Sequence, residues 1–154
     1  MNSVAISGST LNTKLFLPIL VGGALAGTFD LTSAFITLGP KNPLLIAGGL
    51  LGRQALSGGA GTWMLGVVLH YTIAFSAAAI YCVANRRLTF LKEHWIVCGL
   101  FYGIAIYLVM NLVVLPLCAY HYMGPYQYKN MVQGILIHMT IIGLPIAFCL
   151  RRLS

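Results

Sequence analysis

The sequence predicts an all-α membrane protein, a polytopic four-helix bundle in a single domain covering residues 1–154. Three observations indicate this fold class. Hydrophobic residues make up 59% of the chain and charged residues only 7%, whereas soluble domains carry about 25% charged residues. Four apolar segments are long enough to cross a hydrocarbon core of about 30 Å at about 1.5 Å per residue. The nine Lys and Arg residues cluster at the ends of these segments, as topology signals do.

The first predicted span covers residues 15–38 and follows a small, polar tail that ends at Lys14. Pro18 is expected in its first turn, where a missing N–H costs least. The same region also has features of a secretory signal peptide, because the A-L-A run at 24–26 imitates a cleavage site. The turn sequence G-P-K-N-P at 39–43 is expected to end the span.

A short apolar segment at 44–56 follows, and it is too short to cross a membrane. We expect a helix there that either lies at the outer interface or enters the bilayer as a re-entrant segment. The remaining spans are expected at 61–84, 94–117 and 131–150, the last two separated by a tyrosine-rich loop. Pro145 is expected to kink the fourth span, because proline donates no hydrogen bond and clashes with the carbonyl four residues back.

The distribution of basic residues predicts the orientation, since Lys and Arg favour the cytoplasmic side. With both termini in the cytoplasm, six basic residues face inward and three outward. The inner set is Lys14, Arg86, Arg87, Lys92, Arg151 and Arg152, and the outer set is Lys41, Arg53 and Lys129. The four cysteines have no C-x-x-C spacing and are expected to be free.

Two segments share the pattern G-x-x-x-H-x-T-I, one beginning at Gly66 and the other at Gly134. They place His70 and His138 inside the second and fourth spans, which run in the same direction in this topology. The repeat predicts a duplicated helical hairpin with a pseudo-twofold axis along the membrane normal.

Each span also carries one polar side chain at a similar depth. Asp30, His70, Asn111 and His138 are expected roughly 9 to 14 Å below the outer boundary, from a rise of about 1.5 Å per residue. Small residues on the same helical faces favour close packing with these side chains turned inward. Arg53, in the short outer segment, is placed to cap this polar layer or to pair with Asp30.

Three interpretations of the polar layer remain open. It is a hydrogen-bonded layer that fixes the register of the bundle, or a proton path or divalent-metal site formed by Asp30, His70 and His138. Alternatively, His70 and His138 bind a b-type haem between them, as in an electron-transfer subunit. His121 and Met123 form a weaker candidate pair for a soft metal.

No catalytic constellation, phosphate-binding glycine loop or metalloprotease motif is present in the sequence. We therefore expect a non-catalytic protein that serves as an accessory subunit or as a small proton or cation conduit. Its predicted partners are the lipid bilayer and either further copies of itself or a larger membrane complex. Nucleic acid is not expected, because there is no basic face interleaved with exposed aromatic residues.

Several segments resemble a group of small uncharacterised bacterial inner-membrane proteins. These are I-A-G-G-L-L-G at 46–52, L-H at 69–70, R-R-L at 86–88, M-N-L-V-V-L-P-L at 110–117, H-M at 138–139 and G-L-P-I-A at 143–147. More distantly, the chain is similar to the YagU-type family, although it lacks that family's longer outer loop. The resemblance implies a multi-pass protein of the bacterial inner membrane and brings no catalytic residues with it.

Overall fold

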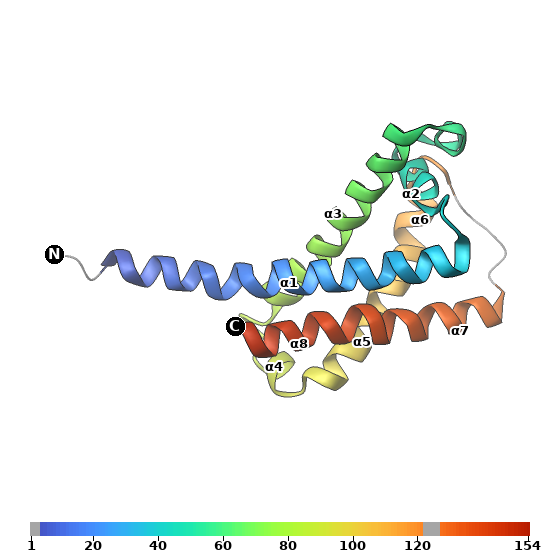
Figure 1. Cartoon of the computed structure of the whole chain (residues 1–154). Coiled ribbons are helices and arrows are strands. Elements are labelled where there is room, and N and C mark those ends of the chain that lie inside the picture. The colour runs from blue at the N-terminus through green and yellow to red at the C-terminus, as the bar shows by residue number, and fades with distance from the viewer. Residues whose placement is uncertain (1–3, 122–126) are drawn as a thin grey trace.

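Four long apolar helices form the body of the molecule in a computed structural model that describes residues 4–121 and 127–154, with side chains from Leu15 onward (Figure 1). Each is long and apolar enough to cross a membrane, and together they confirm the all-α, four-helix fold class. Their apolar parts are Leu15–Leu38, Ala60–Ala84, Trp95–Leu117 and Tyr128–Leu153. The turn and charge signals in the sequence therefore placed each span within a few residues of its limits.

The first helix, α1, is longer than expected and covers Val4–Leu38. Pro18 thus lies inside the helix and not in its first turn. Its side chain is fully buried, and its ring removes the hydrogen bond that would otherwise reach the carbonyl four residues back. Figure 1 shows the N-terminal part of α1 extending past the rest of the bundle.

The short outer segment has two parts, the helix α2 (Asn42–Leu51) and a single 3-10 turn, η1 (Arg53–Ser57). The predicted continuous helix at 44–56 is interrupted because Gly52 has a φ of 75°, which ends α2. The second span is α3 (Ala60–Ala84), and α2 packs along it. The backbone of Pro43 meets Gly66, about 9 Å below the outer end of α3 at about 1.5 Å per residue. This packing places α2 alongside α3 and not beyond its end.

The third and fourth long helices each change from α-helical to π-helical and back. The third consists of α5 (Trp95–Val109), η2 (Met110–Val114) and α6 (Leu115–Leu117). The fourth consists of α7 (Tyr128–Ile137), η3 (His138–Gly143) and α8 (Leu144–Leu153). Both π-helical segments end two residues before a proline, Pro116 or Pro145. Local π-helical turns are one way in which a helix accommodates a proline, so the irregularity expected at Pro145 takes this form.

The helices form a continuous arrangement around one core. The first helix, α1, packs against α3 on one side and against η3 and α8 on the other, and α5 also packs against η3 and α8. The core ends near the short helix α4 (Phe90–Glu93). At this end the centroids of the Tyr81 and Tyr102 rings lie 4.8 Å apart, and this contact connects α3 to α5. The buried core consists of Ala26, Ala78, Tyr81, Cys82, Ile142, Ile146, Ala147 and Leu150.

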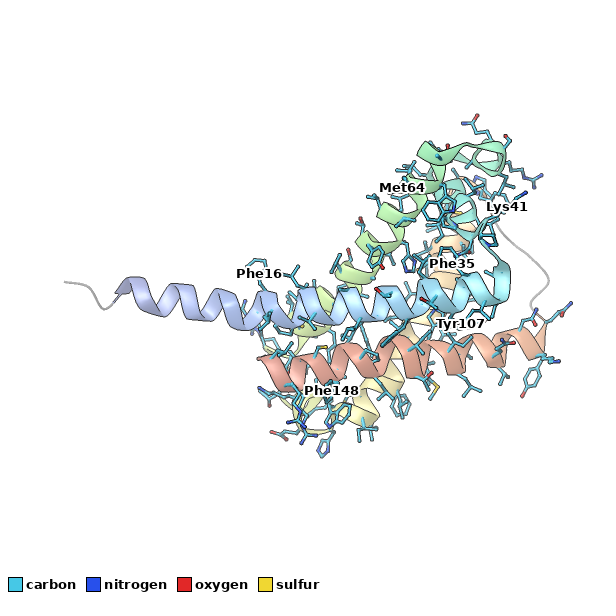
Figure 2. The ribbon with its side chains drawn as sticks, in the orientation of Figure 1. Phe16, Phe35, Lys41, Met64, Tyr107 and Phe148 are labelled. Carbon is cyan, nitrogen blue, oxygen red and sulfur yellow. The ribbon has the colours of Figure 1, made fainter. Side chains whose placement is uncertain are left out.

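In the first hairpin, formed by α1 and α3, two glycines allow the helices to approach closely. A methyl group added to Gly23 would meet Phe75, and one added to Gly27 would meet Tyr71. Phe75 and Tyr71 lie five residues and one residue after His70. At the outer end of this hairpin, Phe35, labelled in Figure 2, stacks on the ring of the α3 tryptophan with centroids 6.3 Å apart.

The second hairpin packs in the same register. A methyl group added to Gly99 would meet Ala147 and Gly143, and one added to Gly103 would meet His138 and Met139. Of these, Gly143 and Met139 lie five residues and one residue after His138, as Phe75 and Tyr71 lie after His70. The shared register agrees with a duplicated hairpin. It also means that these four glycines pack against other helices of the same chain.

The basic residues gather at opposite ends of the bundle, as their distribution in the sequence predicts. Lys92 Nζ donates a hydrogen bond to the carbonyl of Ser154, which ties α4 to the end of α8. Arg151 and Arg152 lie at the same end (Figure 1). All four cysteines are free, as expected.

Candidate functional site

A cavity of about 690 Å³ lies between the four long helices, on the side of the bundle that carries α2. All four residues of the predicted polar layer line it: Asp30, His70, Asn111 and His138. Each comes from a different long helix, and the structure therefore brings together side chains that are far apart in the sequence. We call this space the polar cavity.

The lining of the polar cavity changes from polar to apolar with depth. Toward its outer end, α2 contributes Asn42, and the start of the fourth helix contributes Asn130 and Gln133. At its inner end, the lining residues Ala26 and Ile142 also belong to the buried core. The core therefore forms the floor of the cavity and separates it from the α4 end of the bundle.

His70 is buried, with 8% of its surface exposed, and it joins α3 to α1. Its Nε2–H donates to the carbonyl of Gly27 at 2.8 Å. Because the partner is a carbonyl oxygen, Nε2 must carry the proton. The neighbouring Tyr71 ring stands nearly perpendicular to the imidazole at 5.5 Å, and its hydroxyl lies 2.9 Å from Thr28 Oγ1. This set of contacts fixes the imidazole against α1.

His138 has a different environment, at the first position of the π-helical segment η3. Its Nδ1–H donates to the carbonyl of Gly134 on the preceding turn, at 2.8 Å. The ring of Tyr107 stands edge-on to the imidazole at 5.3 Å, and Gly134 lets this ring approach, since an added methyl group would meet it. Figure 2 labels Tyr107 beside the fourth helix. With Nδ1 protonated in the neutral ring, Nε2 is the nitrogen able to accept a proton.

The two copies of the G-x-x-x-H-x-T-I motif thus use their glycine differently. Gly66 accommodates the backbone of Pro43 in α2, whereas Gly134 accommodates the ring of Tyr107. The histidine in the first copy bonds to another helix, and the histidine in the second bonds to its own helix. The repeated sequence therefore places an imidazole twice on the polar cavity in two distinct chemical settings.

The other two layer residues are an amide and a carboxylate. Asn111 lies in the π-helical segment η2, and its Nδ2 donates to the carbonyl of Tyr107 at 2.9 Å. Asp30 is partly buried and is the single acidic residue among the described residues that line the cavity. A carboxylate in apolar surroundings needs a cation, a proton or water beside it. Asp30 therefore gives the polar cavity a preference for positive charge.

Arg53 is not among the residues that line the polar cavity. It lies in η1 beyond Gly52, which turns the chain away from α2. Its guanidinium carbon lies 5.9 Å from the centroid of the Tyr120 ring. The capping of the polar layer by Arg53, or its pairing with Asp30, stays a prediction.

The candidate metal ligands share the cavity without forming a compact centre. Within residues 4–121 and 127–154, no three His, Cys, Asp or Glu side chains are grouped so that they could hold a metal ion. Metal binding by Asp30, His70 and His138 stays a prediction that requires movement of these side chains. In the outer loop, His121 Nδ1 donates to the carbonyl of Pro116 at 3.2 Å, while its proposed partner Met123 lies outside the described residues, as do Tyr122 and Tyr126.

Haem ligation by His70 and His138 stays a prediction, and their hydrogen bonds determine which nitrogen of each ring could bind iron. A bis-histidine centre needs one unprotonated ring nitrogen from each histidine directed at the iron. The Nε2 atom of His70 is already a donor to Gly27, so His70 would have to turn or bind through Nδ1. His138 keeps Nε2 available. The haem hypothesis therefore requires His70 either to bind iron through Nδ1 or to turn and lose its hydrogen bond to Gly27.

Sequence reasoning missed Asn42 as a cavity residue. It was assigned to a turn, but it begins α2, has only 6% of its surface exposed and lines the cavity. The available signal was the Asn-Pro pair, because proline favours the first positions of a helix. Comparison of the chain with known protein families, with curated proteins and with solved structures finds no match.

Proposed function

We propose that this chain is a non-catalytic, multi-pass membrane protein whose polar cavity binds a proton or a small cation. The observation that carries the proposal is the convergence of Asp30, His70, Asn111 and His138, one from each long helix, on a single cavity. Asp30 supplies the negative charge, and His138 supplies a proton-accepting nitrogen. The core below the cavity closes the route through the bundle.

The surface of the bundle supports insertion in a bilayer. Only 17% to 33% of the most apolar part of each long helix is buried within the chain. Large apolar side chains remain exposed along the helices, including Ile36 at 81%, Phe101 at 67% and Leu117 at 77%. Such extensive apolar exposure is rare in soluble monomers and is satisfied by lipid.

The proposed orientation has both termini in the cytoplasm and the polar cavity facing outward. It rests on six basic residues at the α4 end against three at the α2 end. The bacterial inner membrane is the proposed location, on the strength of the sequence resemblance alone. Because the floor of the cavity is closed, conduction through the bundle would require a conformational change. Without such a change, the protein would bind the cation as an accessory subunit and would not transport it.

Asp30→Asn tests the proposed site, because the substitution keeps the shape of the side chain and removes its charge. We expect wild-type protein in proteoliposomes to move protons, Na⁺, K⁺ or Mg²⁺ down a gradient, and the variant to lose most of this flux. Thr32→Ala is the matched control, since Thr32 is exposed on the same helix, does not line the cavity and donates its hydroxyl to the carbonyl of Thr28.

Cation-dependent thermal shifts of the detergent-solubilised protein separate binding from transport. An increase in Tm with one of these cations that disappears in Asp30→Asn supports the site even when no flux is measured. In that case the protein binds the cation as an accessory subunit and does not transport it. Equal flux and equal shifts in wild type and Asp30→Asn, with both proteins folded, would overturn the proposal.

A further inference from the structure

A second hollow, of about 390 Å³, lies at the α4 end of the bundle. It is lined by Asn85, Thr89, Lys92, Glu93 and Arg151, and we call it the basic pocket. Asn85 directly follows the last residue of α3, and Arg151 lies in the last turn of α8. The pocket is therefore at the level where the apolar helices end, which is the headgroup level of a bilayer in the proposed orientation.

The two cations of the basic pocket keep hydrogen-bond donors available. Lys92 donates to the carbonyl of Ser154, but an ammonium group carries three donors. The Arg151 guanidinium lies over the Trp95 ring, 5.6 Å from its centroid. Stacking occupies the face of a guanidinium and leaves its N–H groups in the plane free to bind oxygen. A phosphate between Lys92 and Arg151 would accept charge-assisted hydrogen bonds from both.

The side chain of Asn85 adds a second requirement for a ligand of the basic pocket, a hydrogen-bond donor. Its Oδ1 is buried and has no hydrogen-bond partner among the described residues. A buried amide oxygen without a donor is destabilising. Because Oδ1 is covered from solvent, the Asn85 amide must turn toward the pocket before a hydroxyl or ammonium group there can donate to it. Glu93 offers a further acceptor on the same lining. The pocket thus combines cations that fit a phosphate with acceptors that fit a donor group close to that phosphate.

We infer that the basic pocket binds the phosphodiester headgroup of an anionic phospholipid that carries hydroxyl donors, as phosphatidylglycerol does. The inference rests on the proposed membrane insertion and orientation, because these bring the pocket to the inner headgroup layer. Basic pockets at the cytoplasmic ends of membrane helices are suited to anionic headgroups. The soluble alternative with the same chemistry is a free phosphate ester.

Native mass spectrometry of the detergent-solubilised full chain tests the inference. Added phosphatidylglycerol should remain bound, whereas phosphatidylcholine should not. Phosphatidylmethanol, which keeps the phosphodiester but lacks hydroxyl donors, should bind more weakly than phosphatidylglycerol because it cannot satisfy Asn85. Lys92→Gln and Arg151→Gln should each lower phosphatidylglycerol retention about tenfold, as expected for the loss of one charge-assisted hydrogen bond.

Two control variants keep the test specific. Arg87→Gln removes an exposed positive charge from the same loop outside the pocket and should leave retention unchanged. Arg151→Lys keeps the charge and should retain most binding, which separates a binding defect from a folding defect. Equal effects of Arg87→Gln and Arg151→Gln, or equal retention of phosphatidylglycerol and phosphatidylcholine, would overturn the inference.

If glycerol 3-phosphate displaces phosphatidylglycerol at an equal concentration, the pocket binds a soluble phosphate ester, and the proposal of a lipid ligand is wrong. The outcome is independent of the polar cavity, since Asp30→Asn should bind phosphatidylglycerol like the wild type. Failure of lipid binding alone leaves the proposed cation site in place. Release of the protein from membranes by alkaline carbonate would remove both proposals together.

Discussion

Glycine residues shape the polar cavity as much as its polar side chains do. Gly66 lets the backbone of Pro43 lie directly on α3, which brings α2 and its buried Asn42 to the cavity wall. Gly134 similarly makes room for the Tyr107 ring beside His138. Both contacts are possible because glycine has no Cβ atom. The positions of α2 and of the Tyr107 ring therefore depend on Gly66 and Gly134.

Gly66→Ala should destabilise the protein by about 1 to 3 kcal/mol, because the added methyl group would overlap the Pro43 carbonyl in a packed contact. Gly61→Ala is the matched control in the same helix, since nothing lies within 4 Å of an added methyl group there. Thermal unfolding in detergent should show a lower Tm for Gly66→Ala only. Equal Tm values for the two variants would mean that α2 is free to move away from α3.

The convergence of Asp30, His70, Asn111 and His138 could be predicted from the sequence, because helical rise is regular and turn signals fix where each span begins. Asn42 and Arg53 could not be placed in this way. Their positions depend on Gly39 and Gly52, which have φ angles of 84° and 75°. Glycine reaches such angles without steric cost, so the direction of the chain there is set by packing and not by the local sequence.

At the level of the elements, the π-helical segments are the main departure from the predicted spans. Pro145 predicts an irregular fourth helix. The sequence does not show that the irregularity would be a π-helical segment before the proline, or that a second one would precede Pro116. The close approach of Gly103 to the backbone of His138 and Met139 lies at the start of η3. The packing of α5 against the fourth helix and the ring of Pro145 therefore both act on η3.

Pro145→Ala should convert η3 toward an α-helix, because alanine restores the backbone donor and removes the ring clash. A change of register by one residue rotates the helix on one side by about 100° and shifts it by about 1.5 Å. Spin labels at Val132 and Val97, both exposed on neighbouring helices, should report an altered distance distribution in this variant. Pro18→Ala, in an uninterrupted α-helix, serves as the control and should leave the distribution unchanged. An unchanged distribution in both would show that packing alone maintains η3.

For the whole molecule, the two hairpins share one packing register, yet they enclose an asymmetric site. The first hairpin carries Asp30 and covers the cavity with α2, whereas the second carries the two π-helical segments. The order and direction of the helices follow from span lengths, turns and charges, all visible in the sequence. The asymmetry arises where the two hairpins differ in sequence, at Asp30, at the α2 segment and at the prolines, and the repeated motif includes none of these positions.

Cysteine accessibility tests the orientation on which the cation site and the lipid site depend. Cys82, Cys98, Cys118 and Cys149 are free, so replacing them with alanine removes no disulfide. In this background, a cysteine at Thr89 marks the α4 end and a cysteine at Lys129 marks the α2 end. A membrane-impermeant maleimide added to intact spheroplasts should label the Lys129→Cys protein and leave the Thr89→Cys protein unlabelled until the membrane is permeabilised. The reverse pattern would place both termini outside. It would then turn the polar cavity toward the cytoplasm and the basic pocket toward the outer leaflet, against the distribution of Lys and Arg.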